Sequence, residues 1–390
     1  MASLVLSKES VEHDLSREAS VPWYLWCAAL AVTSAYIGGY WDISWHRSIG
    51  RDTFWTTPHL AIYACGLLAG ISSAYLIWTS TFSGAALRAS SVRIWGLRGP
   101  IGAFISAWGG VAMLASAPFD DWWHNAYGLD VKIISPPHMV LAAGFFAIEF
   151  GTIMLLLAFM NRADGSARVT LQRLFLYVGG TWIAESLLLK LEYISRSDMH
   201  SSLFYIVVTL GSPAVLIAMA VASRHRWACT IMSAVYTAFG LAFLWILPLI
   251  PAEPKLGPVF RPVTHFIPWE FPLLLIVAAA VVDLIRQQTN DWRPLGRGVV
   301  MGAAFFATFV AVQWPFAKFL MLPIARNRFF GAHYMDYSTR PTSAYARFQF
   351  LNRDPTSALF WRGMIIAFLL SCLMMWIGLH AGRVMQRVKR

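Results

Sequence analysis

The sequence predicts a polytopic, all-α integral membrane protein, a bundle of about ten transmembrane helices built from repeated helical hairpins. Two observations lead to this prediction. Hydrophobic residues make up 57% of the 390 residues and charged residues 13%, whereas soluble domains carry roughly a quarter charged residues. Apolar stretches of about 20 residues, the length that crosses a bilayer as a helix, recur along the whole chain. A soluble fold cannot bury so many all-apolar helices.

The predicted spans follow one another through mostly short connections, and Trp and Tyr gather near their ends, where such rings favour the membrane interface. The spans are residues 22–40, 59–79, 98–118, 138–160, 171–191, 203–222, 228–249, 269–286, 298–320 and 359–381. Five regions result: a cytoplasmic tail, four spans with two repeated motifs, further spans with degenerate repeats, a long outer loop, and a last span with a basic tail. Their bounds are 1–21, 22–160, 161–320, 321–358 and 359–390.

Lys and Arg in the short loops predict the orientation, because positively charged loops stay in the cytoplasm. The loops and tails on one side of the predicted bundle hold 17 of these residues, and the short loops on the other side hold 6. Both termini are therefore expected in the cytoplasm, with the chain in the inner (plasma) membrane. The net charge of +11 is explained by this asymmetry, so membrane lipid rather than nucleic acid is the expected partner. The four Cys form no C-x-x-C pair, which predicts neither a thiolate metal site nor a disulfide framework.

The stretch GYWDISWHRSIGRDTFWTTPHL, between the first two predicted spans, holds the first candidate metal-binding motif. Asp42 and His46 are four residues apart, so a helical extension of the first span places them on one face. Thr57 and Pro58 are typical of a helix start, with Thr as the N-cap, and they put His59 in the first turn of the second span. Since the loop is short, Asp42, His46 and His59 are expected to converge.

The same order of residue types recurs in FDDWWHNAYGLDVKIISPPHM, between the third and fourth predicted spans. Asp120 and His124 are again four residues apart, and His138 follows two prolines at a helix start. Asp121 is a spare carboxylate that can replace or support Asp120. Two imidazoles and one carboxylate suit Cu(II), Zn(II) or non-haem Fe(II), and they leave coordination positions open for water, dioxygen or substrate. The repeat therefore predicts metal binding at both motifs.

A plainer interpretation of the two motifs needs no metal. The motifs can be a duplicated structural hairpin whose Asp and His residues contact water, with Asp42 in an ion pair with Arg47 or Arg51. Other polar residues are weaker candidates. Glu149, Glu185 and Lys190 are expected at interfaces, with Glu185 and Lys190 alternatively in one internal polar network. A third cluster would consist of Glu192, His200, His265 and Glu270.

Taken together, the two motifs resemble those of one membrane-embedded subunit of the copper membrane monooxygenases, the family of the particulate methane and ammonia monooxygenases. The resemblance covers roughly residues 40–140 and rests on Asp42, His46, His59, Asp120, His124 and His138. It implies two copper sites in the membrane-embedded part of the protein, and it adds dioxygen chemistry to a metal site inferred from spacing. The family commonly has Asn at the position of Asp120. The present chain is also longer, with more predicted spans and no cupredoxin domain, and the family's other subunits are not part of it.

The main hypothesis is a copper-containing membrane metalloprotein that hydroxylates a small apolar substrate with dioxygen, in contact with partner membrane subunits. The His residues would hold the metal and the Asp residues would fix charge and geometry. Four Trp residues would exclude water from the pocket: Trp45, Trp55, Trp122 and Trp123.

Three alternatives remain. The first is a zinc-dependent hydrolase of lipid amides or esters, with Ser44, Ser48 or Asp121 handling protons. The second is a metal or proton transporter or an assembly subunit. Transport needs polar residues along the spans, and these are few: Glu149, Glu185, Lys190 and Asp283. Haem is the third and the least favoured, because the His residues cluster at helix ends.

Overall fold

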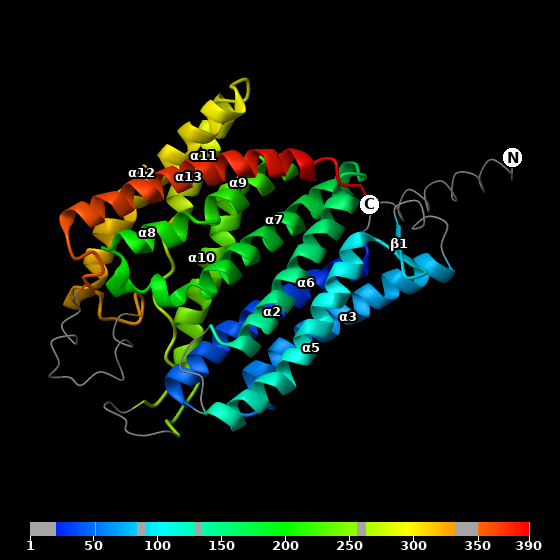
Figure 1. The fold of residues 1–390 in the computed structure, drawn as a ribbon, viewed down its shortest axis with the longest axis horizontal. Coiled ribbons are helices and arrows are strands. Elements are labelled where there is room, and N and C mark those ends of the chain that lie inside the picture. The colour runs from blue at the N-terminus through cyan, green and yellow to red at the C-terminus, as the bar shows by residue number, and fades with distance from the viewer. Residues whose placement is uncertain are drawn as a thin grey trace, which may run out of the picture.

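The computed structural model describes residues 21–50, 52–83, 91–128, 134–255, 263–331 and 350–389, which form a helical bundle with one small β-hairpin (Figure 1). The helices are α2 (Trp23–Ser48), α3 (Thr57–Phe82), α5 (Ile101–Tyr127), α6 (Pro136–Met160), α7 (Gly165–Leu188), α8 (Ser202–Thr209), α9 (Ser212–Ser223), α10 (Ala228–Ile246), α11 (Leu275–Gln288), α12 (Pro294–Leu320) and α13 (Ser357–Met385). Strands β1 (Val92–Ile94) and β2 (Leu97–Gly99) pair antiparallel between α3 and α5. Most of the expected tail (1–21) and much of the long loop (321–358) lie outside the described residues.

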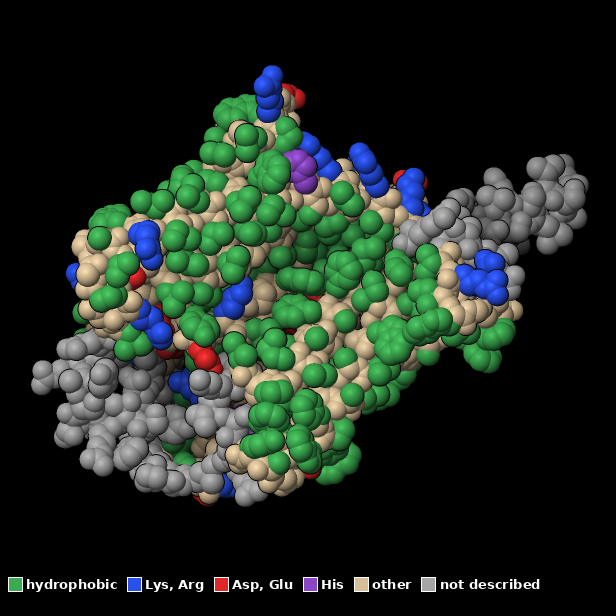
Figure 2. Space-filling model, in the orientation of Figure 1, with side chains coloured by type: hydrophobic (Ala, Val, Ile, Leu, Met, Phe, Trp, Pro, Cys, Tyr) green, Lys and Arg blue, Asp and Glu red, His purple; other side chains and the backbone are tan. Residues whose placement is uncertain are grey.

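Seven helical segments within the described ranges are long and apolar enough to cross a membrane. They are Thr57–Phe82, Ile101–Tyr127, Pro136–Met160, Ser202–Ser223, Ala228–Leu249, Pro294–Leu320 and Ser357–Met385. Their outward faces carry large apolar side chains such as Leu67, Leu114 and Leu369, each more than half exposed. Figure 2 shows hydrophobic side chains spread across the visible face. A surface this apolar is stable in lipid rather than in water, so the chain is a multi-pass membrane protein.

The other three predicted spans correspond to α2, α7 and α11, with shifted ends. Helix α2 continues beyond the predicted residue 40 to Ser48. Helix α11 begins at Leu275 rather than 269, because Pro268 and Pro272 lack the N–H that a helix interior requires. Helix α5 begins at Ile101 rather than 98, since the preceding residues belong to strand β2.

The loops predicted to share the basic side of the bundle do contact one another. The Asn161 side chain, just after α6, donates a hydrogen bond to the backbone carbonyl of Met385 at 3.0 Å. The Arg286 guanidinium at the end of α11 donates to the His225 carbonyl at 2.6 Å. Segments more than sixty residues apart therefore meet at one end of the bundle. This is expected, because an even number of predicted spans separates the two segments in each contact and returns the chain to the same side.

The loops predicted on the opposite side meet at the other end of the bundle. The Lys255 N–H donates to the Ile49 carbonyl at 2.8 Å, and the Ile267 N–H donates to the Ser48 hydroxyl at 2.7 Å. The segment before α11 thereby packs on the end of α2, which carries the first motif. This contact fixes the helix end that presents Asp42 and His46.

Glycine contacts bring the paired helices of each motif close together. A Cβ atom added at Gly102 or Gly109 of α5 would lie 2.4 Å or 2.8 Å from the backbone oxygen of Gly151 or Gly144 in α6. Small residues at such positions let two membrane helices approach closely. In the first hairpin, a Cβ at Gly38 would lie 2.7 Å from the Ile62 side chain. The close packing places the motif-bearing ends of the two helices in each pair next to each other.

Candidate metal centre

The first motif lies where α2 ends and α3 begins. Because α2 is helical to Ser48, Asp42 and His46 lie one turn apart on the same face, as the sequence predicts. Helix α3 starts one residue earlier than expected, with Thr56 rather than Thr57 at the N-cap position. The Thr56 hydroxyl bonds instead to the backbone of Thr53, accepting from its N–H at 2.7 Å and donating to its carbonyl at 2.7 Å. This turn directs His59 back toward α2.

In the first cluster, the Asp42 carboxylate lies between two imidazoles. Its Oδ2 atom is 3.6 Å from His46 Nε2, and its Oδ1 atom is 3.3 Å from His59 Nε2. The expected convergence of these three residues is therefore present in the structure. The three side chains are between 14% and 31% exposed, so water and small solutes can reach them.

Asp52, which the sequence motif does not include, completes the first cluster. Its Oδ2 atom is 3.0 Å from His59 Nε2 and 3.7 Å from His46 Nε2, and its side chain is only 7% exposed. Ligand atoms of Asp42, His46 and Asp52 all lie within 4.8 Å of one another. Asp52 stands in a non-helical loop, where no periodicity marks it. The only sequence signal is its place as an acidic residue between the two His residues.

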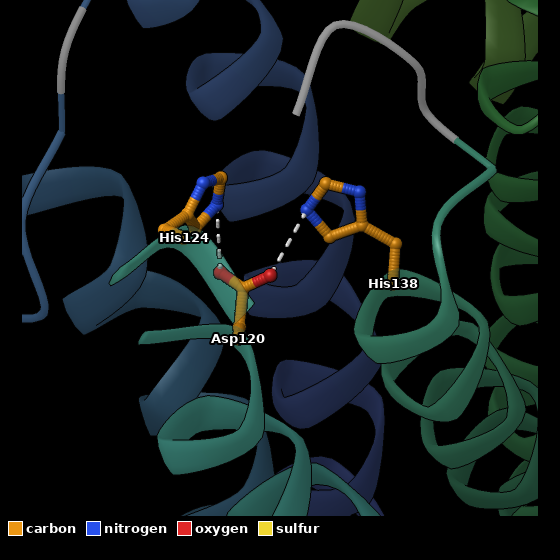
Figure 3. Close-up of side chains that lie close together, drawn as sticks. All are labelled: Asp120, His124 and His138. Atoms are coloured by element: carbon orange, nitrogen blue, oxygen red, sulfur yellow. Dashed lines mark ion pairs between the residues drawn. The ribbon is translucent and has the colours of Figure 1, made fainter. Parts of the chain in front are cut away.

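The second cluster repeats the arrangement of the first (Figure 3). The Asp120 carboxylate lies between two imidazoles, with Oδ2 3.5 Å from His124 Nε2 and Oδ1 3.5 Å from His138 Nε2. The Ser135 hydroxyl at the N-cap of α6 accepts a hydrogen bond from the His138 N–H at 3.4 Å. This cap starts the helix at Pro136 and fixes the backbone that carries His138.

The distances within both clusters fit a shared ion better than direct hydrogen bonds. Nitrogen–oxygen hydrogen bonds are about 2.9–3.0 Å long, whereas most of these pairs are separated by 3.3–3.7 Å. Two ligand atoms, each about 2.1 Å from one ion in tetrahedral geometry, lie about 3.4 Å apart. The Oδ1 atoms of Asp42 and Asp120 are also buried without a well-formed hydrogen bond. Both carboxylates therefore have a coordination position facing the imidazoles.

The hydrogen bond of His46 Nδ1 indicates the tautomer of the ring, and therefore whether Nε2 presents a lone pair to the cluster. His46 Nδ1 lies 3.0 Å from the Gly50 carbonyl oxygen, and only a protonated Nδ1 can donate to a carbonyl. In a neutral ring, Nε2 is then unprotonated and points toward the carboxylates of Asp42 and Asp52. Such an arrangement of three acceptors is stabilised by a cation or a proton between them, and metal-binding His residues are commonly oriented by this kind of backbone hydrogen bond.

Both clusters open into one cavity of about 520 Å³. Their fields overlap, since the charge of His124 in the second cluster acts on Asp52 in the first. Burial raises the pKa of Asp52, but the hydrogen bond from His59 and the nearby imidazole charges outweigh it and lower the pKa below its usual value. Asp52 therefore stays ionised at neutral pH, as a metal ligand must.

The cavity has an acidic rim and an apolar floor. Carboxylates from both motifs and from the segment after α7 line it: Asp42, Asp52, Asp120, Asp121 and Glu192. The remaining lining includes Ile62, Ala142, Phe145, Leu188 and Leu189. The combination suits a cation bound at the rim above an uncharged, mainly apolar guest.

The expectation that four Trp residues dry the pocket is wrong. Trp45, Trp55, Trp122 and Trp123 do not line the cavity, and Trp55 is 71% exposed. Large rings at the ends of membrane helices favour the interface, which explains the exposure of Trp55 and Trp122. Trp45 instead packs against Phe266. The aromatic residues that do line the cavity are Phe54, Tyr63, Phe145 and Trp269.

The residues considered for proton handling in a hydrolase divide into two groups. The Ser44 hydroxyl donates to the Ile267 carbonyl at 2.7 Å, and the Ser48 hydroxyl donates to the Ser44 carbonyl at 2.6 Å. Both are 1% exposed and do not line the cavity, so they hold the end of α2 in place. Asp121 lines the cavity, while its Oδ2 accepts from the Asn125 side chain at 3.4 Å.

The four residues considered as a third cluster do not form a metal-binding group among the described residues. Glu192 lines the cavity of the two motifs, whereas Glu270 accepts a hydrogen bond from the Arg196 N–H. The His200 ring stacks between Trp314 and Phe350, at centroid distances of 3.9 Å and 3.6 Å. His265 lies against its neighbour Thr264, with Nδ1 3.0 Å from the hydroxyl oxygen.

The polar residues considered for a transport path also have local structural contacts. Asp283 accepts hydrogen bonds from Thr230, at 2.8 Å from the backbone N–H and 2.9 Å from the hydroxyl, and thus fixes the start of α10. The Lys190 ammonium group donates to the Leu210 carbonyl at 2.8 Å, where α8 ends. Glu185 does not join Lys190 in a network; it lies against Glu149, between α7 and α6.

Comparison with known proteins gives no relative on which to base a function: no family model, curated protein or solved structure matches the chain. The functional argument therefore depends on the geometry of the two clusters and the cavity.

Proposed function

We propose that this membrane protein binds copper at two Asp/His clusters and contributes to the oxygen-dependent hydroxylation of a small apolar substrate. One observation carries the proposal. Two helical hairpins, 78 residues apart in sequence, each place a carboxylate between two imidazoles at the wall of one cavity. Repetition of such a geometry in two hairpins is explained by a ligand of the same kind at each, and a divalent cation is the ligand that these groups prefer.

Copper is favoured among the divalent metals by the donor set and by the resemblance of the motifs to those of the copper membrane monooxygenases. Imidazole nitrogens suit copper, zinc and iron, and copper has the highest affinity of the divalent first-row ions for such ligands. In the first cluster, Asp42, His46, Asp52 and His59 would hold the ion, and in the second Asp120, His124 and His138. Copper at these positions would supply redox chemistry with dioxygen.

The chain's own residues define what can reach the metal. A cavity of about 520 Å³ with an apolar floor accommodates a small uncharged molecule. We further propose that this cavity opens on the outer side of an inner membrane, with both termini in the cytoplasm, as the distribution of Lys and Arg favours. Partner membrane subunits would cover part of the exposed apolar surface.

The decisive experiment measures the metal content of detergent-purified protein after reconstitution with Cu(II). Wild type is expected to bind about two equivalents, His46→Ala and His124→Ala about one each, and the double variant none, because each substitution removes one imidazole ligand. His265→Ala, which changes a histidine outside both clusters, serves as the matched control and should retain both equivalents. Unchanged copper in all variants would rule out the assigned ligands.

The identity of the metal then decides between functions. Copper binding would justify measuring oxygen consumption with small hydrocarbons. Preferential binding of zinc, with no oxygen-dependent turnover, would favour a membrane hydrolase in which Asp121 handles protons. If no metal binds to the wild type, the clusters are structural and the proposed function is wrong.

A further inference from the structure

Two glutamates lie against each other in the interior of the bundle, below the metal cavity. Glu149 is 0% exposed and Glu185 is 4% exposed, and their carboxyl groups are in hydrogen-bonding contact. Glu149 belongs to α6 and Glu185 to α7, and both helices contribute residues to the cavity. Ionisable groups at such depth are costly and indicate a function.

The hydrogen bonds around the pair require a proton between the two carboxyl groups. The Thr181 hydroxyl lies 2.8 Å from Glu149 Oε1, but it also lies 2.7 Å from the Val178 carbonyl and has only one proton to donate. Among the described residues, the other three carboxyl oxygens have no hydrogen-bond donor. Without a nearby cation, two carboxylates in contact in an apolar environment are not both ionised. One neutral carboxylic acid that donates to one carboxylate satisfies the pair.

The titratable and charged groups around the pair do not supply a compensating positive charge. Besides each other, the groups that act on the two carboxyls within the described ranges include Thr181, Cys65 and Tyr36. Both Cys65 and Tyr36 are buried, at 0% and 3% exposure, and neither can become a cation. The Lys190 ammonium group, five residues after Glu185, is directed to the Leu210 carbonyl, so a cation in the cavity would be an additional source of positive charge for the pair.

The pair lies directly under the cavity floor. Glu149 is four residues after Phe145 on α6, and Glu185 is four residues before Leu189 on α7; Phe145 and Leu189 both line the cavity. Residues four apart on a helix share a face and differ in depth by about 6 Å. The intervening medium is apolar protein without mobile salt, so the field of a bound cation is far less screened there than in water.

We propose that Glu149 and Glu185 form a one-proton site that releases its proton when a divalent cation binds in the cavity. In this step the O–H bond of the carboxylic acid breaks, the proton leaves to water through the cavity, and the pair changes from one negative charge to two. The added negative charge offsets part of the charge of the incoming cation. When the cation leaves, the pair takes a proton back. The inference rests on the proposed metal site.

Zn²⁺ is a suitable probe, because it has the same charge as Cu(II) and no redox chemistry. Zn²⁺ is titrated into full-length protein in two buffers of different ionisation enthalpy, so that calorimetry gives the number of protons released per bound ion. Wild type is expected to release about one proton more than Glu149→Gln/Glu185→Gln. Glu253→Gln, which changes an exposed carboxylate in a loop, is the matched control and should release as many protons as wild type.

A second measurement needs only the wild type, in case the double variant does not fold. The infrared band of a protonated carboxylic acid, identified by its shift in D₂O, should be present before Zn²⁺ is added and should weaken on binding. Equal proton release by wild type and double variant, or a band that ignores bound Zn²⁺, would overturn the inference while leaving the metal site intact. If wild type binds no Zn²⁺, both the metal site and the inference fail.

Discussion

At the scale of single residues, both clusters use the same device, a carboxylate that presents one oxygen to each of two imidazoles. The spacing of four residues between Asp42 and His46, and between Asp120 and His124, is visible in the sequence because helix geometry turns it into one face. Asp52 is not predictable in the same way. Its position depends on the path of an irregular loop, and loop conformation does not follow from a simple period.

Asp52 provides the sharpest test of the first cluster. Asp52→Asn removes a negatively charged ligand oxygen 3.0 Å from His59 Nε2, so the metal affinity of this cluster should fall by at least about tenfold. Competition with a chelator of known affinity measures the change. The second cluster is an internal reference whose affinity should remain nearly constant.

Asp121→Asn is the matched control for this test, since Asp121 lines the same cavity but lies outside both metal-binding groups. It makes the same change of charge and should leave both affinities nearly unchanged. Equal losses in the two variants would show that Asp52 acts only through the general negative charge of the cavity.

At the scale of helices, most spans follow from apolar length, whereas their ends depend on local chemistry. The prolines at 268 and 272 delay the start of α11, and a β-hairpin occupies residues 92–99 just before α5. A hydropathy profile averages the polarity of side chains, so it registers neither the missing proline N–H nor the pairing of two short strands. The helix that begins at Pro136 was predictable from its prolines, because proline favours the first turn of a helix.

Close packing of α5 against α6 should be essential for the second cluster. In Gly109→Ala the new Cβ would lie 2.8 Å from the Gly144 carbonyl and the Ile148 N–H, both backbone atoms. We expect a loss of about 1–3 kcal/mol in stability from such overpacking. A lower melting temperature in detergent, with selective loss of metal from the second cluster, would be the signature.

Gly70→Ala is the control for this substitution, because nothing lies within 4 Å of a Cβ added at that helical position. It should be neutral or stabilise the protein by up to about 1 kcal/mol. If Gly70→Ala and Gly109→Ala lower the melting temperature equally, the contact between α5 and α6 is not the cause.

At the scale of the whole molecule, the alternation of basic and non-basic loops predicts which loops share an end of the bundle, and the hydrogen bonds from Asn161 to Met385 and from Lys255 to Ile49 agree with that grouping. The loop charges do not predict which helices pack against one another. Helix α13 packs on α8, α9 and α12, and the Glu149–Glu185 contact joins two helices. The contacts of α13 with α8 and α9 depend on shape complementarity over long sequence distances, and the side chains that meet between consecutive helices depend on their rotation, which no local pattern encodes.

Cysteine labelling tests the proposed orientation. Trp55→Cys, at an exposed position next to the cavity-lining Phe54, should react with a membrane-impermeant maleimide in sealed right-side-out vesicles. Ser166→Cys, exposed at the opposite end, should react only after the vesicles are opened. The native Cys65, Cys229 and Cys372 are buried, whereas Cys27 is half-buried, so the background reaction is measured on wild type and subtracted. The reverse labelling pattern would invert the proposed topology.

The acidic rim of the cavity has a consequence for the choice of molecules that can enter. Within the described part of the chain, five carboxylates line a space of about 520 Å³, against one arginine, Arg47. Before a metal is bound, this rim acts as an electrostatic filter that admits cations and neutral solutes and repels carboxylates and phosphates. If the proposed metal is bound, anionic chelators should therefore extract it slowly relative to neutral ones of equal affinity.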